Sequence, residues 1–130
     1  MKFFALLMTA MIGLSFSPAF AADRETGSHE KMLHHVVLLK FKAGATKEQI
    51  AHAEQVFADL KNKIPTIVSL EWGTNVSPEH LNRGYTHAFT LTFKTEKDRN
   101  NYLIDPAHKN LGKVLGPILD EVLVIDFWEK

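Results

Sequence analysis

The sequence contains no cysteine among its 130 residues. Disulfide bonds, thiolate nucleophiles and cysteine-based zinc or iron–sulfur sites are therefore excluded. It also lacks a surplus of either charge, because 15 lysines and arginines balance 15 aspartates and glutamates. Binding to nucleic acid normally needs a basic surplus on one face, so this balance argues against a nucleic-acid partner. Internal repeats and low-complexity tracts are absent as well, and the length suits one globular domain.

The first 21 residues have the pattern of a secretory signal. Lys2 supplies a short positive region, and the mostly apolar stretch from Phe3 to Phe16 carries no charge. Ala19-Phe20-Ala21 then fits the small-x-small motif that precedes signal-peptidase cleavage. The alternative, an uncleaved membrane anchor, would need a span of about 20 apolar residues, and this run is shorter. We therefore expect cleavage after residue 21 and a periplasmic or secreted protein.

Cleavage at that point leaves 130 − 21 = 109 residues, with no membrane segment expected in the mature form. Residues 22–31 are polar and are expected to form a flexible lead-in. The remaining residues, 32–130, are expected to form one domain. A chain of this size can bury roughly 65% of its unfolded surface, so it can fold without disulfide bonds.

Hydrophobic periodicity in residues 32–130 predicts four strands and two helical regions. Strands are expected at Leu33–Phe41, Thr66–Trp72, Tyr85–Phe93 and within Leu119–Trp128. A capping-box pattern starting at Thr46 opens an amphipathic helix that runs to about Lys63. A second helical region covers Glu96–Ile104 and Ala107–Leu115, with a break at Asp105-Pro106. Alternation in the third strand is expected to place Tyr85, His87, Phe89, Leu91 and Phe93 on one face.

The resulting order, β-α-β-β-α-β, predicts an α+β protein with a ferredoxin-like fold. One four-stranded antiparallel sheet would carry both helical regions on the same face. The last strand is apolar on both of its sides, so the other sheet face also needs a cover. Because no element of the chain is left for that purpose, we expect a homodimer whose sheets pack face to face and close toward an α+β barrel.

With the strands in place, the sequence resembles the stress-responsive A/B barrel (Dabb) family over residues 34–127. Any one of the matching segments would be weak evidence, and together they are specific to the family. These segments are His35–Lys42, Asn75–Ser77 with Asn82–His87, Tyr102–His108 and Val122–Phe127. The resemblance implies a dimeric α+β barrel, and it says less about activity because most members have no assigned reaction.

Within this family, the sequence is similar to a plant polyketide cyclase that closes a linear thioester by an aldol reaction without a cofactor. The tyrosine and histidine of that enzyme's catalytic pair match Tyr102 and His108, and two histidines of its cavity match His35 and His87. The resemblance therefore implies catalytic roles for the first two residues and no cofactor. The chain departs from that enzyme at Asp105, where the enzyme has a histidine, and in its export signal. These departures leave the substrate open.

The residue types are consistent with a ligand cavity. If His35 and His87 face the barrel interior, they would lie in a mostly apolar lining that includes Phe89 and Leu91, as in many small-molecule pockets. A histidine titrates near neutral pH and can remove an acidic proton beside a carbonyl. A tyrosine hydroxyl can donate a hydrogen bond to the oxygen that gains charge. This chemistry suits His108 as the base and residue 102 as the donor.

Structural alternatives exist for each of these residues. Asp105 could be only a helix cap, with Pro106 at the first helical position. The tyrosine and the histidines could be buried core residues with satisfied hydrogen bonds. Converging histidines could also hold Zn²⁺ or Cu²⁺. The sequence has no HxH or HExxH spacing, however, so we predict no metal site.

Two functions follow as expectations. The first is an exported dimeric barrel that binds a small hydrophobic or carbonyl compound in its cavity and takes part in a stress response. The second is a cofactor-independent acid–base enzyme of the cyclase or lyase type that uses His108 and Tyr102. A haem-linked or oxygenase role is a third alternative, which rests on fold-level analogy alone.

Overall fold

The computed structural model describes residues 29–130. The predicted signal at residues 1–21 and most of the predicted lead-in at residues 22–31 lie outside the described residues, so both stay predictions. Within residues 29–130, no helix combines the length and the apolar character needed to cross a membrane.

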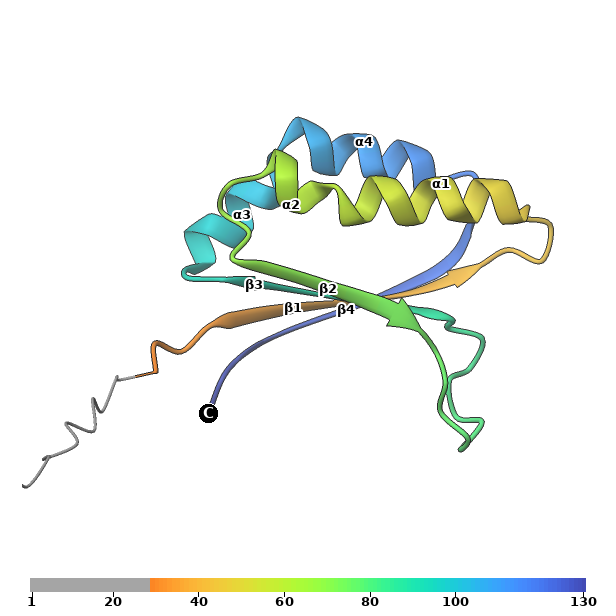
Figure 1. The fold of residues 1–130 in the computed structure, drawn as a ribbon, viewed down its shortest axis with the longest axis horizontal. Coiled ribbons are helices and arrows are strands. Elements are labelled where there is room, and N and C mark those ends of the chain that lie inside the picture. The colour runs from red at the N-terminus through yellow and green to blue at the C-terminus, as the bar shows by residue number, and fades with distance from the viewer. Residues whose placement is uncertain (1–28) are drawn as a thin grey trace, which may run out of the picture.

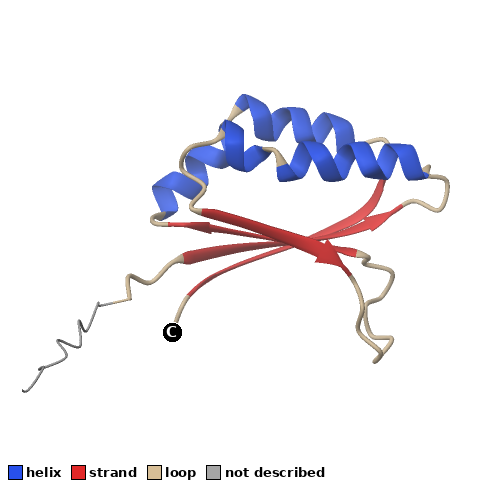
Figure 2. Cartoon of the chain, viewed as in Figure 1, coloured by secondary structure: helices blue, strands red, loops and turns tan. Residues whose placement is uncertain are grey.

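One four-stranded sheet and one layer of helices make up the fold (Figures 1 and 2). The strands lie in the order β2-β3-β1-β4, and every neighbouring pair is antiparallel. All helices cover the same face of the sheet. The predicted α+β ferredoxin-like class is confirmed. The strands are β1 (Leu33–Phe41), β2 (Ser69–Thr74), β3 (His87–Phe93) and β4 (Leu119–Trp128), and the helices are α1 (Lys47–Ala58), α2 (Leu60–Lys63), α3 (Glu96–Ile104) and α4 (Pro106–Leu115).

The helices begin where the sequence places their caps. The Thr46 hydroxyl accepts from the Gln49 amide at 3.1 Å, and the Gln49 side chain accepts from the Thr46 amide at 2.9 Å, which completes the capping box. Asp105 caps α4 by accepting from the Ala107 amide at 2.8 Å, with Pro106 at the first helical position. The break at Asp105-Pro106 therefore separates α3 from α4, as predicted.

Two strands start later than predicted. Thr66 and Ile67 precede β2, and the Ile67 side chain is buried in the core while its amide donates to Ile64 O at 3.2 Å. The apolar run therefore forms a turn before it joins the sheet. Tyr85 precedes β3, and its hydroxyl donates to Glu121 at 3.0 Å instead of sharing the face of His87. The expected common face for residue 85 is wrong because the strand does not begin until residue 87.

Alternate side chains of the strands belong to two different surfaces. The odd-numbered residues of β1 and β3 point to the helices and form the core, in which the rings of Phe57 and Phe89 stack at 3.7 Å. The opposite sheet face, which we call the open face, is covered by no helix of the described chain. On this face β4 exposes Leu123, Ile125 and Phe127, which are 40%, 54% and 47% accessible. Broad exposed apolar surfaces of this kind are typical of protein–protein interfaces.

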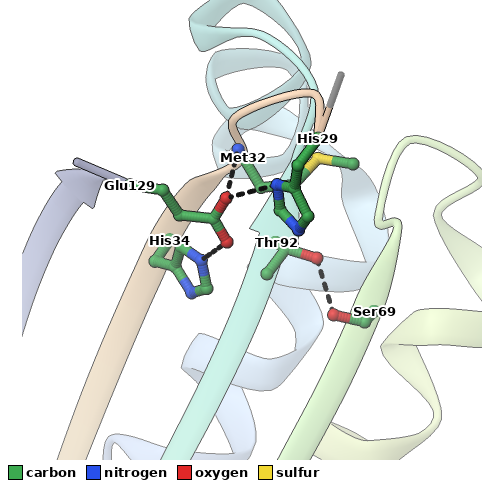
Figure 3. A network of polar contacts seen from close by, with 6 residues as sticks. All are labelled: His29, Met32, His34, Ser69, Thr92 and Glu129. Atoms are coloured by element: carbon green, nitrogen blue, oxygen red, sulfur yellow. Dashed lines mark hydrogen bonds and ion pairs between the residues drawn. The ribbon is translucent and has the colours of Figure 1, made fainter. Parts of the chain in front are cut away.

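The end of β4 is anchored to the start of β1 by a polar network around Glu129 (Figure 3). Its carboxylate is 2.8 Å from His34 Nε2 and 3.3 Å from His29 Nδ1, and it accepts from the Met32 amide at 3.3 Å. The His34 ring also stacks on Phe127 at 4.8 Å. A hydrogen bond from His34 lowers the pKa of Glu129, so the network favours the carboxylate form. It holds the C-terminal end of β4 against the start of β1.

Candidate active site

A cavity of about 500 Å³ lies between the helix layer and the β1–β4 half of the sheet. Most of its walls are apolar, and four residues carry the polar chemistry. The polar residues are His35, Tyr102, His108 and Asp126, and the apolar wall includes Val37, Leu39, Phe57, Leu103, Leu111, Leu115, Leu119, Val122 and Val124. Its volume lies within the range of pockets that hold small organic molecules.

His35 and Asp126 form a hydrogen-bonded pair within this cavity. They stand opposite each other in the β1–β4 register, and His35 Nδ1 is 2.6 Å from Asp126 Oδ1. Because a carboxylate only accepts, Nδ1 must carry the proton. When the imidazole is neutral, its Nε2 is then an acceptor. The second carboxylate oxygen forms an ion pair with Arg99 on α3.

Tyr102 and His108 lie on either side of the break between α3 and α4. The Tyr102 ring is buried, with its centroid 5.5 Å from the ring of His35 and 4.6 Å from that of His108. Burial raises the pKa of the tyrosine hydroxyl, and the negative charge of Asp126 raises it further. The hydroxyl therefore stays protonated at neutral pH and is able to donate a hydrogen bond.

The electrostatics of His108 favour its neutral form. Burial is the main influence and lowers the pKa of the imidazole from its ordinary 6.5, and nearby His35 lowers it as well. The Leu103 backbone and the charge of Asp105 act in the opposite direction. A neutral imidazole thus lies beside a protonated phenol, with the two ring centroids 4.6 Å apart in an edge-to-face arrangement.

His87 does not join this cavity. It pairs with Leu39 of β1, four residues along the strand from His35, which is roughly 13 Å. Both of its ring nitrogens are engaged, Nε2 with Glu54 and Nδ1 with Thr86, each at 2.8 Å. This geometry matches the structural alternative of a buried, hydrogen-bonded histidine.

Two further expectations about the cavity need correction. His35 and His87 were expected to face the interior of a barrel between two sheets, but both point to the helix layer, because the odd-numbered side of β1 and β3 packs on the helices. Phe89 and Leu91, which were expected to line the cavity, are core residues with 1% and 0% accessibility and do not belong to its wall. The site therefore lies within a single chain, between sheet and helices.

Sequence reasoning missed Asp126 and Arg99. A usable signal existed for the aspartate, because it is the one charged residue in the apolar run Val122–Trp128. An isolated charge in such a strand needs a partner when it is buried. Arg99 carried no comparable signal, since it belongs to a polar helix. Within the described part of the chain, no group of three or more histidine, aspartate or glutamate side chains is arranged to hold a metal ion.

Comparison with known proteins identifies the family. The model of the stress-responsive A/B barrel domain, Dabb, matches residues 33–129. The chain belongs to the Dabb family. Among its relatives is the stress-response A/B barrel domain-containing protein HS1 of Arabidopsis thaliana, which is 39% identical over 93 residues, 72% of this chain and 85% of HS1.

Two other similar proteins bear on function and assembly. Olivetolic acid cyclase of Cannabis sativa is 31% identical over 93 residues, which cover 72% of this Dabb chain and 92% of the cyclase. A solved structure from Jannaschia sp. CCS1, described as a dimeric ferredoxin-like protein of unknown function, aligns with a TM-score of 0.65 at 25% identity. That alignment covers 74% of this chain and 97% of the other.

Proposed function

We propose that this Dabb protein is a cofactor-independent acid–base enzyme that acts on a small hydrophobic carbonyl compound. One observation carries the proposal: His35 with Asp126, Tyr102 and His108 surround a single, mostly apolar cavity. The similarity to olivetolic acid cyclase supports the same class of chemistry. The apolar wall would hold the carbon skeleton, while the few polar groups would orient its carbonyl.

The site provides a donor and a base in separate residues. The Tyr102 hydroxyl would donate a hydrogen bond to the substrate carbonyl oxygen, where negative charge develops. His108, which is neutral, would accept a proton from the adjacent carbon. The C–H bond breaks, its electron pair forms the enolate, and the proton moves to the imidazole nitrogen. His35 Nε2, with Nδ1 held by Asp126, offers a second position for a proton at the same cavity.

Completion of an aldol reaction would use the same groups. The enolate carbon forms a new C–C bond to a second carbonyl, and the oxygen of that carbonyl takes the proton back from His108. Protons and electrons then balance without an external oxidant or reductant. Binding of a carbonyl compound without chemistry is the other candidate function, and it uses the same cavity.

Assembly and export belong to the proposal as well. The open face, with Leu123, Ile125 and Phe127 exposed, supports a homodimer in which two sheets pack together. The dimeric structure from Jannaschia sp. CCS1 supports the same assembly. The secretory pattern of residues 1–21 supports a periplasmic or secreted location.

Hydrogen–deuterium exchange next to a carbonyl tests the enzyme without knowledge of its natural substrate. A panel of apolar ketones and 1,3-diketones would be incubated with the protein in D₂O, and loss of the α-proton signal would be followed by NMR. We expect faster exchange with the wild type and a loss of about 100-fold or more in His108→Gln, since general base catalysis contributes that much. Tyr102→Phe should also slow the exchange. His52→Gln, an exposed histidine of α1, is the matched control.

The outcomes separate the two candidate functions. Accelerated exchange that depends on residues 102 and 108 supports the enzyme. Ligand-induced shifts of cavity resonances without accelerated exchange would support a binding protein instead. If no compound of the panel shifts these resonances or exchanges faster, both functions are refuted for apolar carbonyl compounds.

A further inference from the structure

The two carboxylate oxygens of Asp126 contact two different partners, the imidazole of His35 and the guanidinium of Arg99. Its Oδ1 lies 2.6 Å from His35 Nδ1, and its Oδ2 is paired with Arg99 Nη1. The guanidinium is itself fixed, because Nε donates to Asn100 Oδ1 at 2.9 Å. The three side chains are only 6%, 24% and 19% exposed for His35, Asp126 and Arg99, respectively, so solvent screens their charges weakly. A row of three groups thus links α3 to the cavity through β4 and β1.

We propose that Arg99 is a positioning residue that holds Asp126 so that the proton of neutral His35 stays on Nδ1 and Nε2 remains open to a substrate. The use of an open Nε2 by a substrate rests on the proposed function. The arrangement of the three side chains does not. In a neutral histidine, the hydrogen bond made by one ring nitrogen determines which of the two nitrogens carries the proton. With one oxygen held by the arginine, the carboxylate has little freedom to turn away from the ring.

The surroundings of His35 isolate this effect. Tyr102 on α3 and His108 on α4 are the other titratable groups of the cavity, and β3 places the apolar Leu91 opposite His35. The first stays protonated and the second is shifted toward its neutral form. Among the described residues, Asp126 is the only side chain that hydrogen-bonds to the His35 ring, so the position of its carboxylate decides which nitrogen carries the proton. Without Arg99, the carboxylate could turn away from the ring, and the proton would no longer be confined to Nδ1.

Side-chain NMR of the ¹⁵N-labelled, ligand-free protein tests this role. In the wild type, we expect neutral His35 to carry its proton on Nδ1. In Arg99→Gln, a fraction of neutral His35 with the proton on Nε2 should become visible, because the Asp126 carboxylate is no longer held. Arg99→Lys keeps a cation beside Asp126 and should leave the proton on Nδ1. Lys97→Gln removes an exposed charge from the same helix and should leave the proton position unchanged.

Each outcome bears on the inference. A wild-type proton position in Arg99→Gln would overturn it. So would equal Nε2-protonated fractions in the glutamine and lysine variants, because a role for the charge predicts a difference. The lysine variant keeps the test decisive if the glutamine variant does not fold. Exchange of ketone protons is measured separately, so an expected NMR result without any catalysis would refute the proposed enzyme and leave the positioning role intact.

Discussion

The pair formed by His87 and Glu54 allows a structural role to be measured against a catalytic one. Glu54 on α1 holds His87 Nε2 at 2.8 Å, and the histidine is only 8% exposed. In Glu54→Ala the ring nitrogen loses this partner while it stays buried. Leaving a buried polar group unpaired costs about 1–3 kcal/mol. Because the glutamate side chain is 26% exposed, water can replace part of the contact, and we expect about 1–2 kcal/mol.

Urea denaturation at fixed protein concentration would measure this loss in free energy of unfolding. Gln55→Ala is the matched control, since it truncates an exposed neighbour on the same helix and should change stability by less than about 0.5 kcal/mol. Ketone proton exchange by folded Glu54→Ala should match that of the wild type, because residue 87 lies roughly 13 Å along the sheet from His35. Unchanged stability of Glu54→Ala would refute a structural role for His87. If ketone proton exchange were lost while stability stayed unchanged, His87 would instead take part in the proposed site.

Three further predictions concern assembly, pH and the helix break. Ile125→Asp on the open face should give monomers in analytical ultracentrifugation, whereas Ile104→Asp, an exposed position on the helix layer, should leave the dimer intact. The acid limb of the exchange rate should lie below pH 6.5, because burial lowers the pKa of His108. Below pH 6.5 the unfolded chain binds more protons at residue 108 than the folded chain, so the free energy of unfolding should fall as the pH drops. The fall should be smaller in His108→Gln, and an identical dependence of melting temperature on pH in the two proteins would contradict this. Asp105→Ala should cost about 1 kcal/mol of stability through loss of the α4 cap, which chemical denaturation can detect.

Local signals predicted much of the fold. The capping box at Thr46 and the Asp105-Pro106 break were readable because each depends on residues within one turn of a helix. The bounds of β1 also matched, and β4 fills the run that was expected to contain the fourth strand, since apolar residues mark both segments. The start of β2 was wrong because Ile67 is as buried in a turn as it would be in a strand. Hydrophobicity reports burial, and it does not report which backbone conformation achieves burial.

The candidate site was less accessible to sequence reasoning. Alternation shows which side chains share a face, but it does not show what covers that face, so His35 was placed on the wrong side of the sheet. Its partner Asp126 lies 91 residues away, and only the β1–β4 register brings the two together. Tyr102 and His108 were paired through the resemblance to the plant cyclase, and they lie six positions apart, on either side of one helix break. Long-range pairing of this kind needs the three-dimensional structure.

The register of β4 fixes two properties of the molecule at once. Asp126 reaches the cavity, while its neighbours Ile125 and Phe127 lie on the open face. A slip of one residue would send the carboxylate to the outer surface and put an apolar side chain beside His35. The same slip would place a charge within the surface that we assign to the second copy. Chains that misalign this last strand would therefore lose the proposed site and the proposed dimer surface together, so both depend on correct pairing of the C-terminal strand.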